Sequence, residues 1–249
     1  MKKVLFTAAV AAAGLAFGIE SANTVGYLNN GDTVAGLNMV APGFQDVGLT
    51  STKLTGLKVT NASGGEVGTG ACLISLIDEI GNTLKVYSWA STGRGTSKTW
   101  GWKEGTTAVG DNVTFARGAG LLFTAETVGD TVKSAGEVNL SAVTNSETVA
   151  GLNVIANPFP LTVKLNTLKV TNASGGEVGT GACLISLIDG IGNTLKVYSW
   201  ASTGRGTSKT WGWKEGTTAV GDDVTFNPGQ AILFTAESTG DKLIFPAQE

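Results

Sequence analysis

The chain contains an internal duplication that covers most of its length. Residues 57–115 match residues 168–226 at an offset of 111, and only two of these 59 positions differ. The match continues more loosely on both sides, where residues 33–38 match 148–153 and residues 122–126 match 233–237. Each copy is therefore about 110 residues long, which suits one small domain and is too long for a solenoid repeat. The duplication predicts two similar domains in tandem.

The two copies meet without a Pro-rich or Ser-rich linker. We place the first domain at residues 19–134 and the second at residues 135–249, and we expect them to lie close together. A surface site within the near-identical segment must occur twice in such a chain. Duplication therefore favours bivalent binding or assembly over catalysis.

Residues 1–18 have the pattern of a signal peptide. Two lysines precede an apolar stretch at residues 4–17 that is too short to span a membrane. The small-x-small rule favours cleavage after Gly18, because cleavage after Ala22 would put Glu20 at the −3 position. We therefore predict an extracytoplasmic protein (secreted, periplasmic or at the cell surface) with no transmembrane segment in the mature chain.

Composition narrows the possible function classes. The net charge is −3 and the chain has no basic run, so nucleic acid is not an expected partner. The chain has no histidine, which removes the commonest general base and the commonest metal ligand. No nucleophile, acid/base pair, metal cluster or EF-hand pattern stands out. We predict that the protein is not an enzyme and holds neither a cofactor nor a metal.

The mature chain has the pattern of short strands separated by tight turns. Glycine is abundant, with 36 residues, and Val, Thr and Ser recur, which favours strands over helices. In the first copy, residues 25–28 and 33–40 flank an Asn-Gly turn and predict a β-hairpin. Residues 71–77 are apolar on both faces and predict a buried central strand. Residues 84–90 predict a strand with Leu84 and Val86 on one face and Tyr87 and Trp89 on the other.

This pattern, together with the duplication, predicts the fold class. Many short strands with Gly, Asn and Asp turns are typical of small sandwiches and barrels. We predict an all-β protein of two tandem β-sandwich-like or barrel-like domains.

Four motifs point to a family. The start of the predicted mature chain contains ESANTVGY at residues 20–27, and the second copy contains GLNVIANPF at 151–159, YSW at 198–200 and PGQAILF at 228–234. These motifs resemble those of exported β-rich domains from Verrucomicrobia- and Lentisphaera-type bacteria, and they are similar to secreted Bacteroidetes domains. The first copy departs from the pattern, with APGF and RGAG in the corresponding places. The resemblance implies an extracytoplasmic β-rich module and implies no particular activity.

Tryptophans are the strongest candidates for ligand-binding residues. Two on one strand, Trp100 and Trp102, are two residues apart and so face the same way. Exposed, coplanar rings could stack on sugar faces. Alternatively the rings cover one side of a small core, because each aromatic side chain buries roughly 150–250 Å²; we favour this second interpretation. The candidate set from both copies is Trp89, Trp100, Trp102, Trp200, Trp211 and Trp213.

One cysteine occurs at the same position of each copy. Cys72 and Cys183 lie in equivalent apolar segments. An oxidising compartment would allow a disulfide between the domains or between molecules. Alternatively, both are buried free thiols that act as small hydrophobes, which is the interpretation we favour.

These observations support two hypotheses for function. The first is a secreted structural or adhesive protein of a cell surface or extracellular matrix, capable of self-assembly. The alternative is a tandem carbohydrate-binding module that uses the Trp-bearing strands. The expected partners are other copies of the chain or surface glycans.

Overall fold

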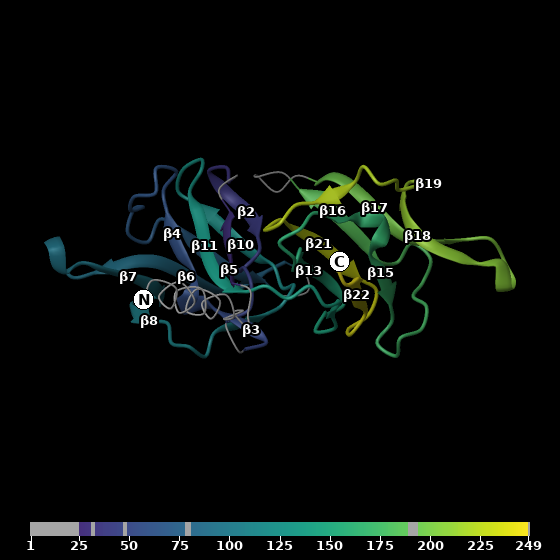
Figure 1. Cartoon of the computed structure of the whole chain (residues 1–249), viewed down its shortest axis with the longest axis horizontal. Coiled ribbons are helices and arrows are strands. Elements are labelled where there is room, and N and C mark those ends of the chain that lie inside the picture. The colour runs from purple at the N-terminus through teal and green to yellow at the C-terminus, as the bar shows by residue number, and fades with distance from the viewer. Residues whose placement is uncertain (1–24, 31–32, 47–48, 78–80, 189–193, 249) are drawn as a thin grey trace, which may run out of the picture.

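The computed structural model describes residues 25–30, 33–46, 49–77, 81–188 and 194–248. The predicted leader and its cleavage positions lie outside these ranges. Within the described residues, strands dominate and the only helices are four three-residue 3-10 turns. The all-β prediction is confirmed, and Figure 1 shows two sheet-rich bodies arranged side by side along the long axis.

The first copy is a β-sandwich-like domain of antiparallel strands. Its larger sheet has six strands in the order β2 (Gly36–Val40), β10 (Leu121–Ala125), β5 (Leu73–Ile77), β6 (Thr83–Thr92), β7 (Thr99–Glu104) and β8 (Thr107–Ala108). A three-stranded sheet has the order β1 (Val25–Asn30), β11 (Thr131–Glu137) and β4 (Lys58–Thr60). A short pair is formed by β3 (Ser51–Lys53) and β9 (Thr114–Ala116). The 3-10 turns are η1 (Leu54–Gly56) and η2 (Gly95–Ser97).

The second copy repeats this order. Its six-stranded sheet contains β13 (Gly151–Ala156), β21 (Ala231–Ala236), β16 (Leu184–Ile188), β17 (Thr194–Thr203), β18 (Thr210–Glu215) and β19 (Thr218–Ala219). The three-stranded sheet contains β12 (Val143–Asn145), β22 (Lys242–Phe245) and β15 (Lys169–Thr171). The short pair is β14 (Val163–Lys164) with β20 (Thr225–Phe226), and the turns are η3 (Leu165–Thr167) and η4 (Gly206–Ser208). The duplicated sequence therefore folds twice in the same way.

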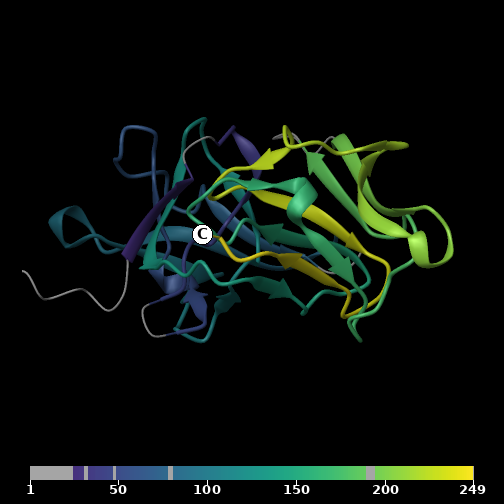
Figure 2. The ribbon, with the colours of Figure 1, turned by 45° about the vertical axis from the view of Figure 1, so that its right-hand side comes forward.

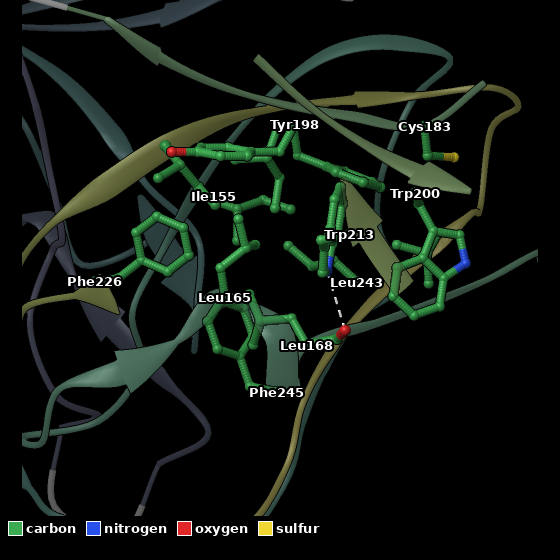
Figure 3. Packing of buried hydrophobic residues seen from close by; sticks show 14 of the residues in the cluster. Ile155, Leu165, Leu168, Cys183, Tyr198, Trp200, Trp213, Phe226, Leu243 and Phe245 are labelled. Carbon is green, nitrogen blue, oxygen red and sulfur yellow. Dashed lines mark hydrogen bonds between the residues drawn. The ribbon is translucent and has the colours of Figure 1, made fainter. Parts of the chain in front are cut away.

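Each copy has its own hydrophobic core between its sheets. In the first, Ile74 of β5 and Phe123 of β10 pack with Val132 of β11, which is on the opposite sheet. The second core is built from equivalent residues, and Figure 3 shows part of it around Tyr198 and Phe245. Fully burying a side chain of this size stabilises the fold by roughly 1.5–3 kcal/mol.

The predicted hairpin between residues 25–28 and 33–40 is wrong. β1 pairs with β11, where Tyr27 lies opposite Ala135, whereas β2 pairs with β10, where Asn38 lies opposite Phe123. The chain therefore changes sheets between β1 and β2. The Asn38 amide accepts a hydrogen bond from the Val34 N–H and donates one to the Val34 oxygen, which holds the entry to β2. An Asn-Gly pair indicates a local turn, but it does not determine which strands the segments before and after the turn pair with.

The prediction of a buried central strand at residues 71–77 holds in part. β5 lies between β10 and β6, as expected of a central strand, and Cys72 and Ile74 are fully buried on its core side, whereas Leu73 and Leu76 are only partly buried. The prediction for residues 84–90 is confirmed. On β6, Leu84 is 65% exposed whereas Tyr87 is 2% exposed, so the two faces of the strand divide as predicted.

Strand β11 crosses the domain boundary predicted at 134/135. It runs to Glu137, which lies opposite Val25 in the three-stranded sheet of the first copy. The three-stranded sheet of the first copy therefore extends three residues beyond the predicted boundary, and residues 138–142 connect β11 to β12.

The two copies meet around a local two-fold axis. Val40 forms an antiparallel bridge with Gln230, and Ile155 forms one with Ala119. In the sequence alignment, Val40 corresponds to Ile155 and Ala119 to Gln230. Each contact is thus the symmetric counterpart of the other, which defines an isologous interface.

Backbone hydrogen bonds between the copies follow the same symmetry. The Ala41 N–H donates to the Gly229 oxygen at 2.9 Å, and the Ala156 N–H donates to the Gly118 oxygen at 2.8 Å. A small cluster of buried residues lies at this junction, consisting of Leu28, Ala41, Phe44, Ala156 and Ala231. Figures 1 and 2 show β2 and β10 next to β13 and β21 in the middle of the molecule. The interface fixes the two domains relative to each other.

Candidate functional site

Two of the three tryptophans in the first copy belong to its core. Trp89 of β6 lies opposite Trp102 of β7, and their rings meet edge to face with centroids 5.3 Å apart. Trp102 is 2% exposed, and its Nε1–H donates to the Leu57 oxygen at 2.9 Å. Because a buried indole N–H needs an acceptor, this bond places the ring in the core. Neither ring offers a platform for a sugar.

Trp100 lies on the same face of β7 but at the rim of the core, half-buried. Its ring stacks on Trp89, with centroids 6.1 Å apart and planes 13° apart. Its Nε1–H donates to Glu66 Oε1 at 2.9 Å, and Lys98 Nζ lies 4.6 Å from the ring centroid. Hydrogen bonds from Lys98 and then from Trp100 lower the pKa of the Glu66 carboxyl. The ring is thus held by three neighbours, and the tryptophans of this copy cover one side of the core, as in the favoured interpretation.

The second copy repeats this arrangement. Trp211 stacks on Trp200 with centroids 6.2 Å apart, and Trp200 meets Trp213 edge to face at 5.4 Å. Trp213 donates to the Leu168 oxygen at 3.0 Å, a bond drawn in Figure 3. The six tryptophans therefore form two clusters of three, one in each domain, and not one shared site.

The hairpin between β6 and β7 forms an exposed tip, as does its counterpart between β17 and β18. Each tip contains a 3-10 turn with the sequence Gly-Thr-Ser after an exposed arginine, Arg94 in one copy and Arg205 in the other. Within the described ranges neither arginine has an ion-pair partner. Figure 1 places the two tips at opposite ends of the long axis. One sequence is thus presented at both ends of the molecule.

Cys72 and Cys183 are free and fully buried, one in each core. The thiol of Cys72 donates to Asp130 Oδ2 at 3.6 Å, and that of Cys183 donates to Asp241 Oδ2 at 3.7 Å. Burial, reinforced by the neighbouring carboxylate, raises the pKa of each thiol to about 11. The structure contains no bridge between the two cysteines, and their burial keeps them from a partner molecule.

Sequence reasoning missed two clefts between the domains. The first, the Arg117 cleft, has a volume of about 490 Å³. The second, the Pro228 cleft, has a volume of about 420 Å³. They are symmetry counterparts, because equivalent residues line both, including Ile77 and Ile188, and Asn145 and Asn30. The Arg117 cleft is lined by Ser75, Ile77, Leu84, Leu122, Asn145 and Leu152, among others.

A signal for these clefts is present in the sequence. The copies diverge immediately after their near-identical segment, where residues 116–120 read ARGAG and residues 227–231 read NPGQA. The first of these segments lines the Arg117 cleft and the second lines the Pro228 cleft, apart from Gly118. The divergence therefore marks the interface, where the two halves have acquired different side chains.

No group of three His, Cys, Asp or Glu side chains that could hold a metal ion occurs in the described part of the chain. Over the same residues, no helix has the length and apolar character needed to cross a bilayer. Comparisons with protein-family models, curated proteins and solved structures find no match to this chain.

Proposed function

We propose that this protein is a structural or adhesive module of a cell surface or extracellular matrix, and that it joins two partners through its two ends. The observation that carries the proposal is the presentation of one tip sequence at opposite ends of the long axis. A symmetric interface of backbone hydrogen bonds holds those ends apart. A body that presents two equal sites at a fixed separation can bridge partners, and bridging gains strength from multivalency.

Charge supports self-association as the form of bridging. The first-copy tip contains Arg94 and Lys98, and in the described part of the chain only Lys98 of these two has an ion-pair partner, Glu66. The ends therefore carry excess positive charge, whereas the whole chain has a net charge of −3. Opposite potentials on two surfaces favour their encounter. The cationic end of one copy fits the acidic body of another, and a surface glycan with negative charge is the other partner of this chemistry.

The proposal includes an extracytoplasmic location and no catalytic activity. The location rests on the signal-peptide pattern of residues 1–18, and the second point rests on the lack of histidine and of a nucleophile constellation in the sequence. A tandem carbohydrate-binding function that uses the tryptophans has less support. Trp89 and Trp102 are buried, and Trp100 is engaged by Trp89, Glu66 and Lys98.

Light scattering of the purified chain without its predicted leader tests the proposal. We expect the mass to rise with protein concentration and to be unaffected by reductant, because both thiols are buried. The double variant Arg94→Ser/Arg205→Ser should remain monomeric. The matched control is Lys58→Ser/Lys169→Ser, which removes the same charge from exposed positions on β4 and β15 and should still assemble. A wild-type chain that stays monomeric at every concentration would refute self-assembly.

A further inference from the structure

The outer face of the three-stranded sheet in the first copy presents an exposed aromatic ring. Tyr27 of β1 is 83% exposed, the highest value among the large hydrophobic side chains of the described residues. The residue opposite it on β11 is Ala135, whose side chain is too small to cover a phenol ring. A single exposed tyrosine is ordinary, so the side chains around it decide whether this face binds a partner.

Two lysines face each other on the same side of this sheet. Lys133 of β11 lies directly opposite Lys58 of β4, and both alternate with buried residues, so they point away from the core as Tyr27 does. Among the described residues, neither lysine forms an ion pair. Like charges directly opposite each other destabilise a sheet. A negatively charged group bound between the two ammonium groups would remove that repulsion.

Asn29 extends this row of polar side chains onto the third strand. It is exposed on β1 and lies opposite Lys133, on the side away from Lys58. The row therefore crosses the whole sheet, and Tyr27 lies beside it, two residues along β1. Glu137 is the carboxylate on this face of β11, and it is four residues from Lys133, or about 13 Å along the strand. The row itself thus carries positive charge only.

The second copy lacks this arrangement, although its strands pair in the same register. Ala142 takes the place of Tyr27, and Ile244 takes the place of Lys133. The residue opposite Lys169 in that sheet is therefore apolar. The exposed ring and the opposed charges belong to one copy and are not a general consequence of the fold.

We propose that this surface, the Tyr27 face (Tyr27, Asn29, Lys58 and Lys133), binds an anionic polysaccharide built from uronic acids. The C–H face of a pyranose ring is apolar and stacks on the phenol ring, while a carboxylate lies between the two ammonium groups. Charge-assisted hydrogen bonds of this kind are stronger than neutral ones.

An acidic peptide fits the Tyr27 face less well than a glycan does. Protein partners are usually held by a well-packed apolar centre, and this face offers one ring beside an alanine. The Tyr27 face also belongs to a different sheet from the tip hairpins. The proposal therefore does not rest on the bridging role.

Isothermal titration of the purified chain with a short oligogalacturonate tests this site. The fully methyl-esterified oligomer keeps the rings and loses the charge, whereas a short polyglutamate keeps the charge and has no sugar. We expect saturable binding at one site per chain, which weakens as salt is added because exposed charges are screened. The methyl ester should bind about tenfold more weakly, and polyglutamate at least about threefold more weakly.

Substitutions taken from the second copy assign the binding to the Tyr27 face. Lys133→Ile and Tyr27→Ala introduce the residues that the second copy has at these positions, and each should weaken oligogalacturonate binding by about threefold or more. The control Lys169→Ser removes a charge from the second copy's sheet and should leave binding unchanged. The tip variant Arg94→Ser/Arg205→Ser should also bind normally, so failure of this site and failure of the bridging role are distinguishable.

Circular dichroism identifies any variant that fails to fold, and the other variant then decides. Absent binding by the wild type, two sites per chain, equal binding of the methyl ester or of polyglutamate, or unchanged binding by a folded Lys133→Ile or Tyr27→Ala chain would each overturn the proposal.

Discussion

Trp102 and Leu57 are joined by a hydrogen bond of 2.9 Å between the indole Nε1 and the backbone oxygen, and both residues are buried. We predict that Trp102→Phe lowers the free energy of unfolding by about 1–3 kcal/mol through the unsatisfied carbonyl alone, with a further loss from the smaller ring. Urea unfolding followed by circular dichroism measures this change.

Trp100→Phe is the matched control for that substitution. It also removes an indole N–H, but the acceptor is the exposed Glu66, which water can solvate. We expect a loss of less than about 1 kcal/mol. If the two variants lose equal stability, the buried acceptor is not what distinguishes Trp102 from Trp100.

Gly118 should not tolerate a side chain. Its φ is 86°, in the left-handed region, and a Cβ there would meet Asn145 of the other domain at 2.7 Å. Gly105→Ala is the control, because Gly105 has a φ of 61° and open space around a built Cβ. Left-handed strain costs an alanine roughly 1–2 kcal/mol at either position. We predict that Gly118→Ala loses more stability than Gly105→Ala in urea unfolding, and an equal loss would show that the interface is loose at this point.

The thiols of Cys72 and Cys183 should be unreactive in the folded chain. Both are buried, and a pKa of about 11 keeps them protonated at neutral pH, whereas the thiolate is the reactive form. We predict no reaction with Ellman's reagent in native buffer and two thiols per chain in denaturant. Rapid reaction of the native chain would mean that the cores open, and fewer than two thiols in denaturant would reveal a disulfide.

The sequence predicted the repeated all-β fold through two signals. Alternation of polar and apolar residues is a local property of each strand, and the duplication is found by comparing the chain with itself. Alternation on β6 separates Leu84 from Tyr87 whatever the strand pairs with, and a duplicated sequence must form its core twice. The pairing of β1 with β11 was not predictable in the same way. Val25 and Glu137 lie opposite each other although more than a hundred positions separate them in the chain. A nearby Asn-Gly turn was the stronger local signal, and it indicated the wrong partner.

For the candidate sites too, local sequence spacing was informative, whereas contacts between distant segments could not be predicted. Spacing placed Trp100 and Trp102 on one face of β7, but it could not show that Trp102 lies beneath the Leu57 carbonyl and Trp100 at the rim. The Arg117 cleft was also beyond sequence reasoning, because its walls come from both copies and meet only through the two-fold contact. Only the divergence of the copies after residue 115 marked its position.

The carboxyl of Glu66 and its equivalent Glu177 should make stability depend on acidity. Hydrogen bonds from Lys98 and Trp100, and from Lys209 and Trp211, lower the pKa of the two carboxyls below 4.5 in the folded chain. The folded state then binds fewer protons than the unfolded state, so this stabilisation is full above the ordinary pKa and is lost as pH falls through the lowered one. We predict that Glu66→Gln/Glu177→Gln loses less stability than the wild type between about pH 5 and about pH 3. Urea unfolding across this range measures the difference. The control Glu147→Gln, at a carboxylate without an ion-pair partner in the described chain, should follow the wild type, and parallel pH profiles for all three chains would contradict the assignment.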